Sequence, residues 1–204
     1  PVMTRLRELC DQYELLLIAD EIQTGVGRTG KWFAYQHYGI VPDIVALAKG
    51  MASGMPLGAC VASPELMAKW TTGSHGGTFG GNPVSCAAGI ATLEVLSECI
   101  EGISDKGNTA LNYLHHVLDD TPSVGSIRGV GLMIAIEFVS DKTTRNPNPD
   151  HLKKVMAACF DQKVIAVSCG IYDNVLRLMP ALTISDSELM KGLEIVVKAI
   201  HENT

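Results

Sequence analysis

Three short runs of hydrophobic residues stand out in the first part of the chain. They cover residues 15–19, 44–48 and 57–62. Uninterrupted apolar runs of this length are typical of strands that are buried on both faces of a parallel sheet. The first part of the chain is therefore predicted to contain a mostly parallel sheet flanked by helices.

The spacing of apolar residues becomes helical or alternating further along the chain. Asn82 and Pro83 form an N-cap and first-turn signal, and the pattern changes near Gly102. The spacing predicts helices over residues 64–70, 83–96, 111–118, 152–160 and 185–200, and strands over 132–138, 164–167 and 175–178. We therefore expect an α/β domain over residues 1–101 and a smaller α+β domain over residues 102–204.

Composition and charge narrow the classes of function. The 204 residues carry a net charge of −6, which disfavours a nucleic-acid partner because such proteins need a basic face. No apolar run is expected to span a membrane. The six cysteines form no C-x-x-C pair, which predicts free thiols in a reducing, cytoplasmic compartment and no metal site.

A glycine-rich segment follows the first apolar run. Residues 25–30 match the G-x-G-x-x-G pattern, but the motif is not placed directly at the strand end and no acidic residue lies about 20 residues on. Trp32 stands where a P-loop needs a Ser or Thr hydroxyl. The segment is therefore interpreted as a turn and not as a nucleotide site.

Two polar residues end neighbouring apolar runs. Lys49 ends the second run, and Asp20 ends the first. Ligands of open parallel sheets bind at the carboxyl ends of strands, and a partly desolvated lysine amine there becomes a nucleophile. A carboxylate at Asp20 could pair with a protonated ring nitrogen, which makes a pyridine ring an electron sink. Without further context, Lys49 as a surface strand cap and Asp20 as a turn residue remain open.

Three more residues are candidates for binding. The amide of Gln23 could reach the same ligand as Asp20, or could be a solvated loop amide. Thr78 lies in a glycine-rich loop ahead of a predicted helix start, which suits an anion such as phosphate, although a flexible loop has the same composition. Arg177 stands among apolar residues and needs an anionic partner, either a substrate carboxylate or a structural ion pair.

Together these segments resemble the class III aminotransferases, which have the fold-type I pyridoxal-phosphate architecture. Four ordered segments from about residue 5 to the end of the chain carry the resemblance: Asp20 to Gly30, Pro42 to Gly50, Gly77 to Pro83 and Asn174 to Ile184. The chain is similar to the carboxyl-terminal half of that family, so the phosphate-binding turn and part of the substrate pocket are expected upstream.

The resemblance implies a function for each candidate. Lys49 would form the Schiff base with pyridoxal 5'-phosphate, Asp20 would pair with the ring nitrogen, and Gln23 would approach the phenolic oxygen. Thr78 would bind the phosphate of the partner subunit's cofactor, which implies a homodimer, and Arg177 would bind the substrate carboxylate. The expected partners are an amino acid and a 2-oxo acid.

Within the family, the segment around Ser168 to Gly170 is similar to the branch that acts on 4-aminobutyrate and other omega-amino acids. An ornithine or acetylornithine aminotransferase and an amino-acid racemase or epimerase of the same family are the alternatives. A non-enzymatic interaction module is the alternative of a different class, and it would bind no cofactor.

Overall fold

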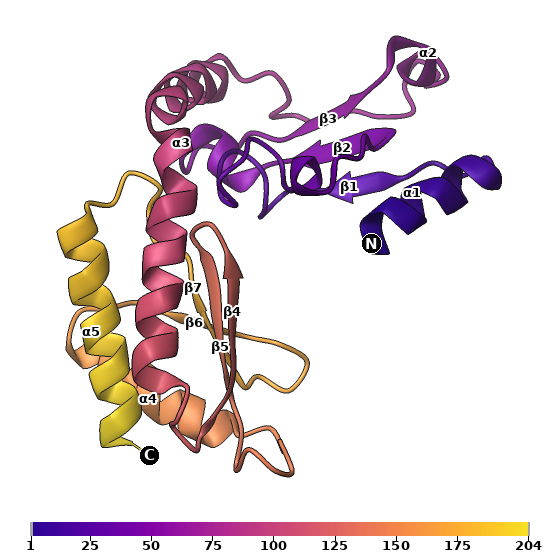
Figure 1. The fold of residues 1–204 in the computed structure, drawn as a ribbon. Coiled ribbons are helices and arrows are strands. Elements are labelled where there is room, and N and C mark those ends of the chain that lie inside the picture. The colour runs from indigo at the N-terminus through magenta and orange to yellow at the C-terminus, as the bar shows by residue number, and fades with distance from the viewer. Residues whose placement is uncertain (1, 204) are drawn as a thin grey trace. The chain divides into compact units, whose positions relative to one another are not determined.

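The computed structural model describes residues 2–203 and contains two compact units, Pro1–Glu101 and Gly102–Thr204. One helix, α3 (Pro83–Leu118), contributes residues to both units. Figure 1 labels the helices and strands of each unit.

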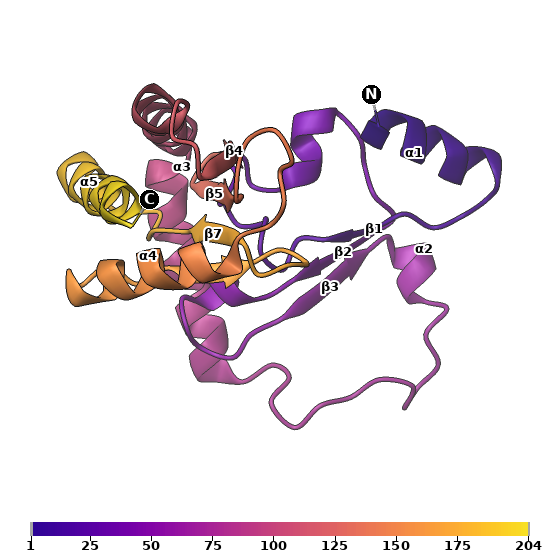
Figure 2. The same ribbon diagram turned by 90° about the horizontal axis from the view of Figure 1, so that it is seen from below.

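The first unit is built on a three-stranded sheet. Its order is β1 (Ile18–Asp20), β2 (Ile44–Leu47) and β3 (Ala59–Ala62), which lie side by side in Figure 2. β1 pairs parallel with β2, whereas β3 pairs antiparallel with β2. Helix α1 (Val2–Gln12) precedes β1, α2 (Pro64–Met67) follows β3, and two 3-10 helices, η1 (Ala34–Tyr38) and η2 (Lys49–Ala52), lie in the connections. The α/β class is confirmed, with a mixed sheet.

The three apolar runs do form strands, but they are not buried on both faces. Ile18 is 60% exposed, and Leu15 and Leu16, which precede β1, are 57% and 54% exposed. Only Leu47 of β2 is buried. The prediction of double-sided burial is wrong for these residues, because that pattern requires a covering layer on each face and the described part of the chain leaves these side chains in solvent.

Helix α3 is one continuous helix of 36 residues where the sequence predicts two shorter ones. Gly102, near the expected break, lies inside it. Tertiary packing overrides the helix-weakening effect of glycine, because the second half of α3 carries core residues of the second unit: Ile103, Ala110, Leu114 and Leu118, none more than 1% exposed.

By length and composition, α3 could cross a membrane. Its most apolar 18-residue window has a mean hydropathy of 1.3. The helix meets this test by its length and average composition, whereas Glu94 and Glu98 interrupt its apolar sequence.

The second unit packs helices on a four-stranded antiparallel sheet of order β4-β5-β7-β6. Its elements are β4 (Val124–Val130), β5 (Met133–Phe138), α4 (Pro149–Asp161), β6 (Val167–Cys169), β7 (Val175–Leu178) and α5 (Asp186–Glu202). Alternate residues of β5 (Ile134, Ile136 and Phe138) are buried, as its pattern predicts. Helix α4 packs against β5, β7 and α5.

Most predicted elements of the second unit are confirmed, with two departures. The strand expected over residues 164–167 begins only at Val167. Strand β4 is not predicted by the sequence, because Gly125 and Gly129 interrupt its apolar alternation. The capping box of α5 is present, with Ser185 accepting from the Glu188 backbone and Glu188 accepting from the Ser185 backbone.

Candidate active site

Asp20 and Lys49 lie at the same edge of the first sheet. β1 and β2 run parallel, with Asp20 opposite Ala46, and the backbone N–H of Glu21 donates to the Ala46 carbonyl oxygen at 3.0 Å. Lys49 follows Ala46 by three residues and is separated from the end of β2 by Ala48 alone. Since the carboxyl ends of parallel strands meet at one edge, the two candidate residues are brought to a common edge.

The Lys49 backbone has an unusual conformation. Its φ angle is 49°, in the left-handed region that non-glycine residues rarely adopt, and it opens the 3-10 helix η2. Its side chain is exposed, so the described residues do not provide the partial desolvation that the sequence predicts. The amine is accessible to a ligand from solvent.

The two adjacent carboxylates at this edge differ in their surroundings. Asp20 is exposed and accepts a hydrogen bond from the Ile22 backbone N–H at 3.1 Å. Glu21 is only 3% exposed and accepts from the Tyr35 backbone N–H at 2.9 Å and from the Thr24 hydroxyl. Glu21 therefore anchors the turn, whereas the Asp20 carboxylate is exposed to solvent.

The glycine-rich segment is a turn, as predicted, and no helix starts in it. Gly25 donates its N–H to the Glu21 carbonyl oxygen at 2.9 Å. A Cβ at Gly25 would lie 2.7 Å from that oxygen and 3.2 Å from Leu47 Cδ2, so only glycine allows the turn to approach the end of β2. Gln23 lies half-buried in the same turn, between Asp20 and Gly25.

Asp43 ties the start of β2 to neighbouring elements. It accepts from Arg7 on α1 and from the Leu17 backbone N–H, both at 2.7 Å. The hydrogen bond from Arg7 lowers the pKa of the Asp43 carboxyl, so the pair is ionised at neutral pH. These contacts hold the amino-terminal ends of β1 and β2 in register.

Thr78 lies in the exposed loop between α2 and α3. Four residues later, Asn82 caps α3, its side-chain oxygen accepting from the N–H groups of Val84 and Ser85 at 3.0 and 3.1 Å. A hydroxyl and a run of glycines therefore precede the start of a long helix, an arrangement that can bind an anion.

Arg177 lies on β7 of the second unit and is half-buried. It pairs with Ala135 of β5 and Val167 of β6. Its neighbours Leu176 and Leu178 are buried, so the Arg177 side chain is on the opposite face of this sheet.

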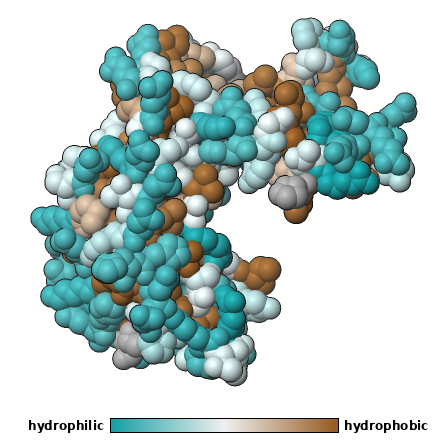
Figure 3. Space-filling model, in the orientation of Figure 1, coloured by the Kyte–Doolittle hydropathy of each residue, from teal (hydrophilic) through white to brown (hydrophobic). Residues whose placement is uncertain are grey.

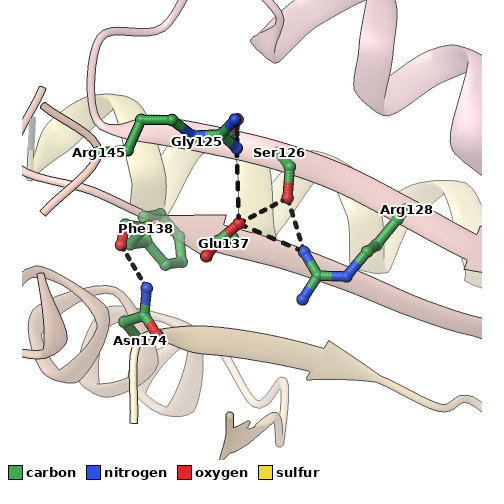
Figure 4. A network of polar contacts seen from close by, with 7 residues as sticks. All are labelled: Gly125, Ser126, Arg128, Glu137, Phe138, Arg145 and Asn174. Carbon is green, nitrogen blue, oxygen red and sulfur yellow. Dashed lines mark hydrogen bonds and ion pairs between the residues drawn. The ribbon is translucent and has the colours of Figure 1, made fainter. Parts of the chain in front are cut away.

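A buried asparagine sets the register that places Arg177. Asn174, 3% exposed, donates from Nδ2 to the Phe138 carbonyl oxygen at 2.8 Å, and the Phe138 N–H donates to the Asn174 carbonyl oxygen at 2.7 Å. Figure 4 shows this contact at the start of β7. Sequence reasoning does not assign a function to Asn174; a polar residue ahead of a buried strand is the available signal.

The same close-up shows a second polar group on β4 and β5 (Figure 4). Ser126 donates to Glu137 Oε2 at 2.8 Å, and Arg128 donates to the Ser126 hydroxyl at 2.6 Å. Arg145 lies 3.9 Å from the same carboxylate. Glu137 thus holds two guanidinium groups, which stabilises the sheet face that also carries Arg177.

Comparisons with known proteins identify the family. The sequence model of the family described as aminotransferase class III matches residues 2–200. The chain belongs to the class III aminotransferases. It is 38% identical over 202 residues to the 4-aminobutyrate aminotransferase GabT of Escherichia coli K12, covering 98% of this chain and 47% of the relative.

Other class III relatives extend the comparison. An acetylornithine aminotransferase of Mesorhizobium japonicum is 44% identical over 194 residues, covering 94% of this chain and 46% of the relative. A solved Bacillus anthracis aminotransferase superposes with a TM-score of 0.91 at 36% identity, covering 98% of this chain and 48% of that one. The chain spans about half the length of the curated relatives it matches.

These relatives carry aminotransferase names, so the racemase alternative receives no support from them. The class III family is an enzyme family that depends on pyridoxal 5'-phosphate. The residues of the first unit fit that cofactor: Lys49 offers an accessible primary amine for its aldehyde, and Asp20 offers an exposed carboxylate at the same sheet edge for its ring nitrogen. Among the described residues, no group of His, Cys, Asp and Glu could hold a metal ion.

Proposed function

We propose that the protein is a pyridoxal-phosphate-dependent aminotransferase in which Lys49 holds the cofactor. The proposal rests on the positions of Asp20 and Lys49 at the carboxyl ends of two hydrogen-bonded parallel strands, β1 and β2. Units 1–101 and 102–204 would correspond to part of the cofactor-binding domain and to the small carboxyl-terminal domain.

Lys49, Asp20 and Gln23 would each contact a different part of the cofactor. Pyridoxal phosphate supplies an aldehyde that binds amines and a ring that withdraws electrons from the substrate carbon. Lys49 would bind the aldehyde covalently and, once displaced by the substrate amine, would move a proton at the substrate carbon. Asp20 would keep the ring nitrogen protonated. Gln23 would donate to the phenolic oxygen side of the ring.

Two further residues would bind the charged groups of the cofactor and the substrate. Thr78, in the loop before α3, would bind the phosphate of the partner subunit's cofactor. Arg177 would bind the substrate carboxylate through paired N–H groups. The half-buried position of Arg177 among apolar neighbours supports this, because a partly desolvated guanidinium binds an anion more strongly than an exposed one.

For the substrates, we propose 4-aminobutyrate or another omega-amino acid as donor and 2-oxoglutarate as acceptor. The sequence similarity of the segment Ser168–Gly170, which includes the end of β6, to that branch supports this choice. The similarity to acetylornithine aminotransferase makes N-acetylornithine or ornithine the second candidate. Assay of the full-length protein with each donor and 2-oxoglutarate distinguishes them by the rate of glutamate formation.

A homodimer in the cytoplasm completes the proposal. Val84, Ala87, Ala91 and Val95 recur at helical spacing along an exposed side of α3, and a stripe of this kind suits contact with a second copy. Apolar residues show at the surface in the region of α3 in Figure 3. The free state of all six cysteines suits a reducing compartment.

Replacing Lys49 tests the central assignment. In the full-length protein, Lys49→Ala should remove the visible absorbance of lysine-bound cofactor and reduce turnover to background, because the variant lacks the amine that would bond to the aldehyde. Lys69→Ala, which removes another exposed lysine of the first unit, should leave both unchanged. An unaltered spectrum in Lys49→Ala refutes the assignment, and a colourless wild-type protein refutes the enzyme proposal itself.

Replacing Arg177 tests substrate binding. Arg177→Ala should raise the KM for the carboxylate substrate about tenfold or more, because a charge-assisted hydrogen bond is lost. Steady-state kinetics with the full-length protein measure this, and Arg145→Ala, an exposed arginine of the same unit, serves as control. An unchanged KM in Arg177→Ala would assign that side chain to a structural ion pair.

A further inference from the structure

The turn that carries Lys49 has two residues in the left-handed region of backbone conformation. Lys49, the first residue of η2, has φ 49°, and Ser53, directly after η2, has φ 47°. Neither residue is glycine, so each conformation is disfavoured by contact between its own Cβ and backbone. Such conformations persist only where the surrounding structure imposes them.

Helix α3 packs directly on this turn. Gly89 is buried on the face of α3 that also carries Ser85 and Leu96. A Cβ at Gly89 would lie 2.8 Å from Leu57 Cδ2 and 3.5 Å from the Met51 carbonyl oxygen. The helix backbone therefore comes close to η2 and to the segment that follows it, and the absence of a side chain at Gly89 allows this approach.

A polar contact fixes the same interface one helical turn further along. The Thr92 hydroxyl donates to the Ala88 carbonyl oxygen at 2.7 Å and lies 3.1 Å from the Ser53 hydroxyl. Thr92 follows Gly89 by three residues, so both face the turn. The contact reaches Ser53, the second left-handed residue.

We propose that Gly89 and Thr92 are positioning residues for Lys49, which hold its backbone in the left-handed conformation by docking α3 onto the turn. The part of this inference that concerns catalysis rests on the proposed function of Lys49. With the backbone held, the direction of the Lys49 side chain is set before the cofactor binds, which is the preorganisation that a covalent catalyst needs.

Three glycines of α3 provide matched variants. Gly89 meets the lysine turn, a Cβ at Gly102 would have no neighbouring atom within 4 Å, and a Cβ at Gly107 would lie 2.2 Å from the Gly131 carbonyl oxygen in the second unit. Gly89→Val and Gly102→Val change helix propensity alike, but only the first affects the turn. Gly107→Ala strains the second unit, which does not contain Lys49.

The experiment uses the full-length protein and two readouts. The first is amide hydrogen exchange of residues 48–53 without cofactor, and the second is the pH titration of the visible absorbance of lysine-bound cofactor. In Gly89→Val, exchange should rise about tenfold or more, and the titration midpoint should move by at least about half a pH unit. Gly102→Val should match the wild type in both, and Gly107→Ala should lower the melting temperature without moving the midpoint.

Thr92→Val is the second variant, because it keeps the side-chain volume and the fold while removing the hydroxyl. It should change both readouts in the same direction as Gly89→Val, by a smaller amount. The inference is overturned if Thr92→Val keeps wild-type values in both readouts while Gly89→Val either keeps them too or misfolds. It is also overturned if the titration midpoint shifts as far in Gly107→Ala as in Gly89→Val. A wild-type protein without visible absorbance refutes the proposed function, while the exchange comparison still decides whether α3 holds the turn.

Discussion

At the residue scale, two adjacent carboxylates of the first unit differ in their exposure to solvent. Asp20 and Glu21 are neighbouring carboxylates, yet Glu21 is buried within a turn and Asp20 is exposed at the sheet edge. Successive residues at a strand end point to opposite sides, which separates the two. The buried Glu21 carboxylate accepts hydrogen bonds from Tyr35 and Thr24 and so stabilises the turn, while the Asp20 carboxylate stays exposed at the sheet edge.

A buried histidine gives the second unit a pH-dependent stability. His151 on α4 is 7% exposed, its ring lies 4.9 Å from that of Phe138, and its Nε2 has no hydrogen-bond partner. Burial, with a smaller contribution from Lys154, lowers the His151 pKa from 6.5. The unfolded chain therefore binds the proton more readily, and the stabilising contribution is complete above pH 6.5 and is lost as the pH falls below it.

We predict that His151→Leu weakens this pH dependence. The free energy of unfolding of the wild type should fall more steeply between about pH 7.5 and pH 5.5 than that of the variant, because only the wild type takes up this proton on unfolding. Urea unfolding of the full-length protein at several pH values measures the slopes. His116→Leu, at an exposed position of α3, should keep the wild-type slope; equal slopes in His151→Leu and wild type would contradict the account.

At the element scale, packing decides the length and register that local sequence leaves open. Helix α3 continues through Gly102 and Gly107, and the absence of a Cβ at Gly107 allows the Gly131 backbone to approach. β7 is short, and its register depends on the contact between Asn174 and Phe138. Arg177 is opposite Ala135 as a consequence of that register.

Asn174→Ala should lower the free energy of unfolding by about 1–3 kcal/mol, because a buried hydrogen bond is lost. Since the Phe138 carbonyl oxygen also accepts from the Asn148 N–H, no buried acceptor is left unsatisfied, and the fold should persist. Asn108→Ala, at an exposed site on α3, should stay within about 0.5 kcal/mol of the wild type. Urea unfolding measures both, and a loss as small as that of Asn108→Ala would refute the structural importance of Asn174.

At the scale of the whole molecule, the exposed apolar stripe on α3 is a candidate interface for a homodimer. Val84 is 61% exposed and Val95 is 51% exposed, and the buried face of α3 at Gly89 is directed elsewhere. Apolar side chains aligned on a helix and left in solvent disfavour an isolated protein and favour an interface. This is the part of the surface that we assign to a second copy.

We predict that Val84→Asp combined with Val95→Asp shifts the full-length protein from dimer to monomer, because burying two unpaired carboxylates at the interface is costly. Sedimentation velocity gives the mass directly. Ser97→Asp, at an exposed position on another side of α3, should leave the dimer intact. A dimeric double variant would exclude this stripe as the interface, and a monomeric wild type would exclude the dimer.

Much of the fold and of the candidate site is predictable from sequence because its signals are local. Apolar runs ending in Asp20 and Lys49 predict strand ends with polar residues, and the Ser185 capping box predicts the start of α5. Strand β4 is not predicted because its glycines allow close backbone contacts and interrupt the local alternation of apolar residues. A Cβ at Gly129 would lie 2.7 Å from the Met133 carbonyl oxygen. Helix α1 is not among the predicted elements either, although Met3, Leu6 and Cys10 recur there at helical spacing.

The sequence by itself determined the family, the order of the strands and helices around the site, and the chemical types of the candidate residues, since these depend on residue identity and short-range periodicity. Only the tertiary structure decided that Asp20 and Lys49 share one sheet edge, that Glu21 is buried beside them, and that α3 docks through Gly89 onto the strained lysine turn. The physical reason is that strand direction, burial and close backbone approach depend on contacts between residues that are distant along the chain.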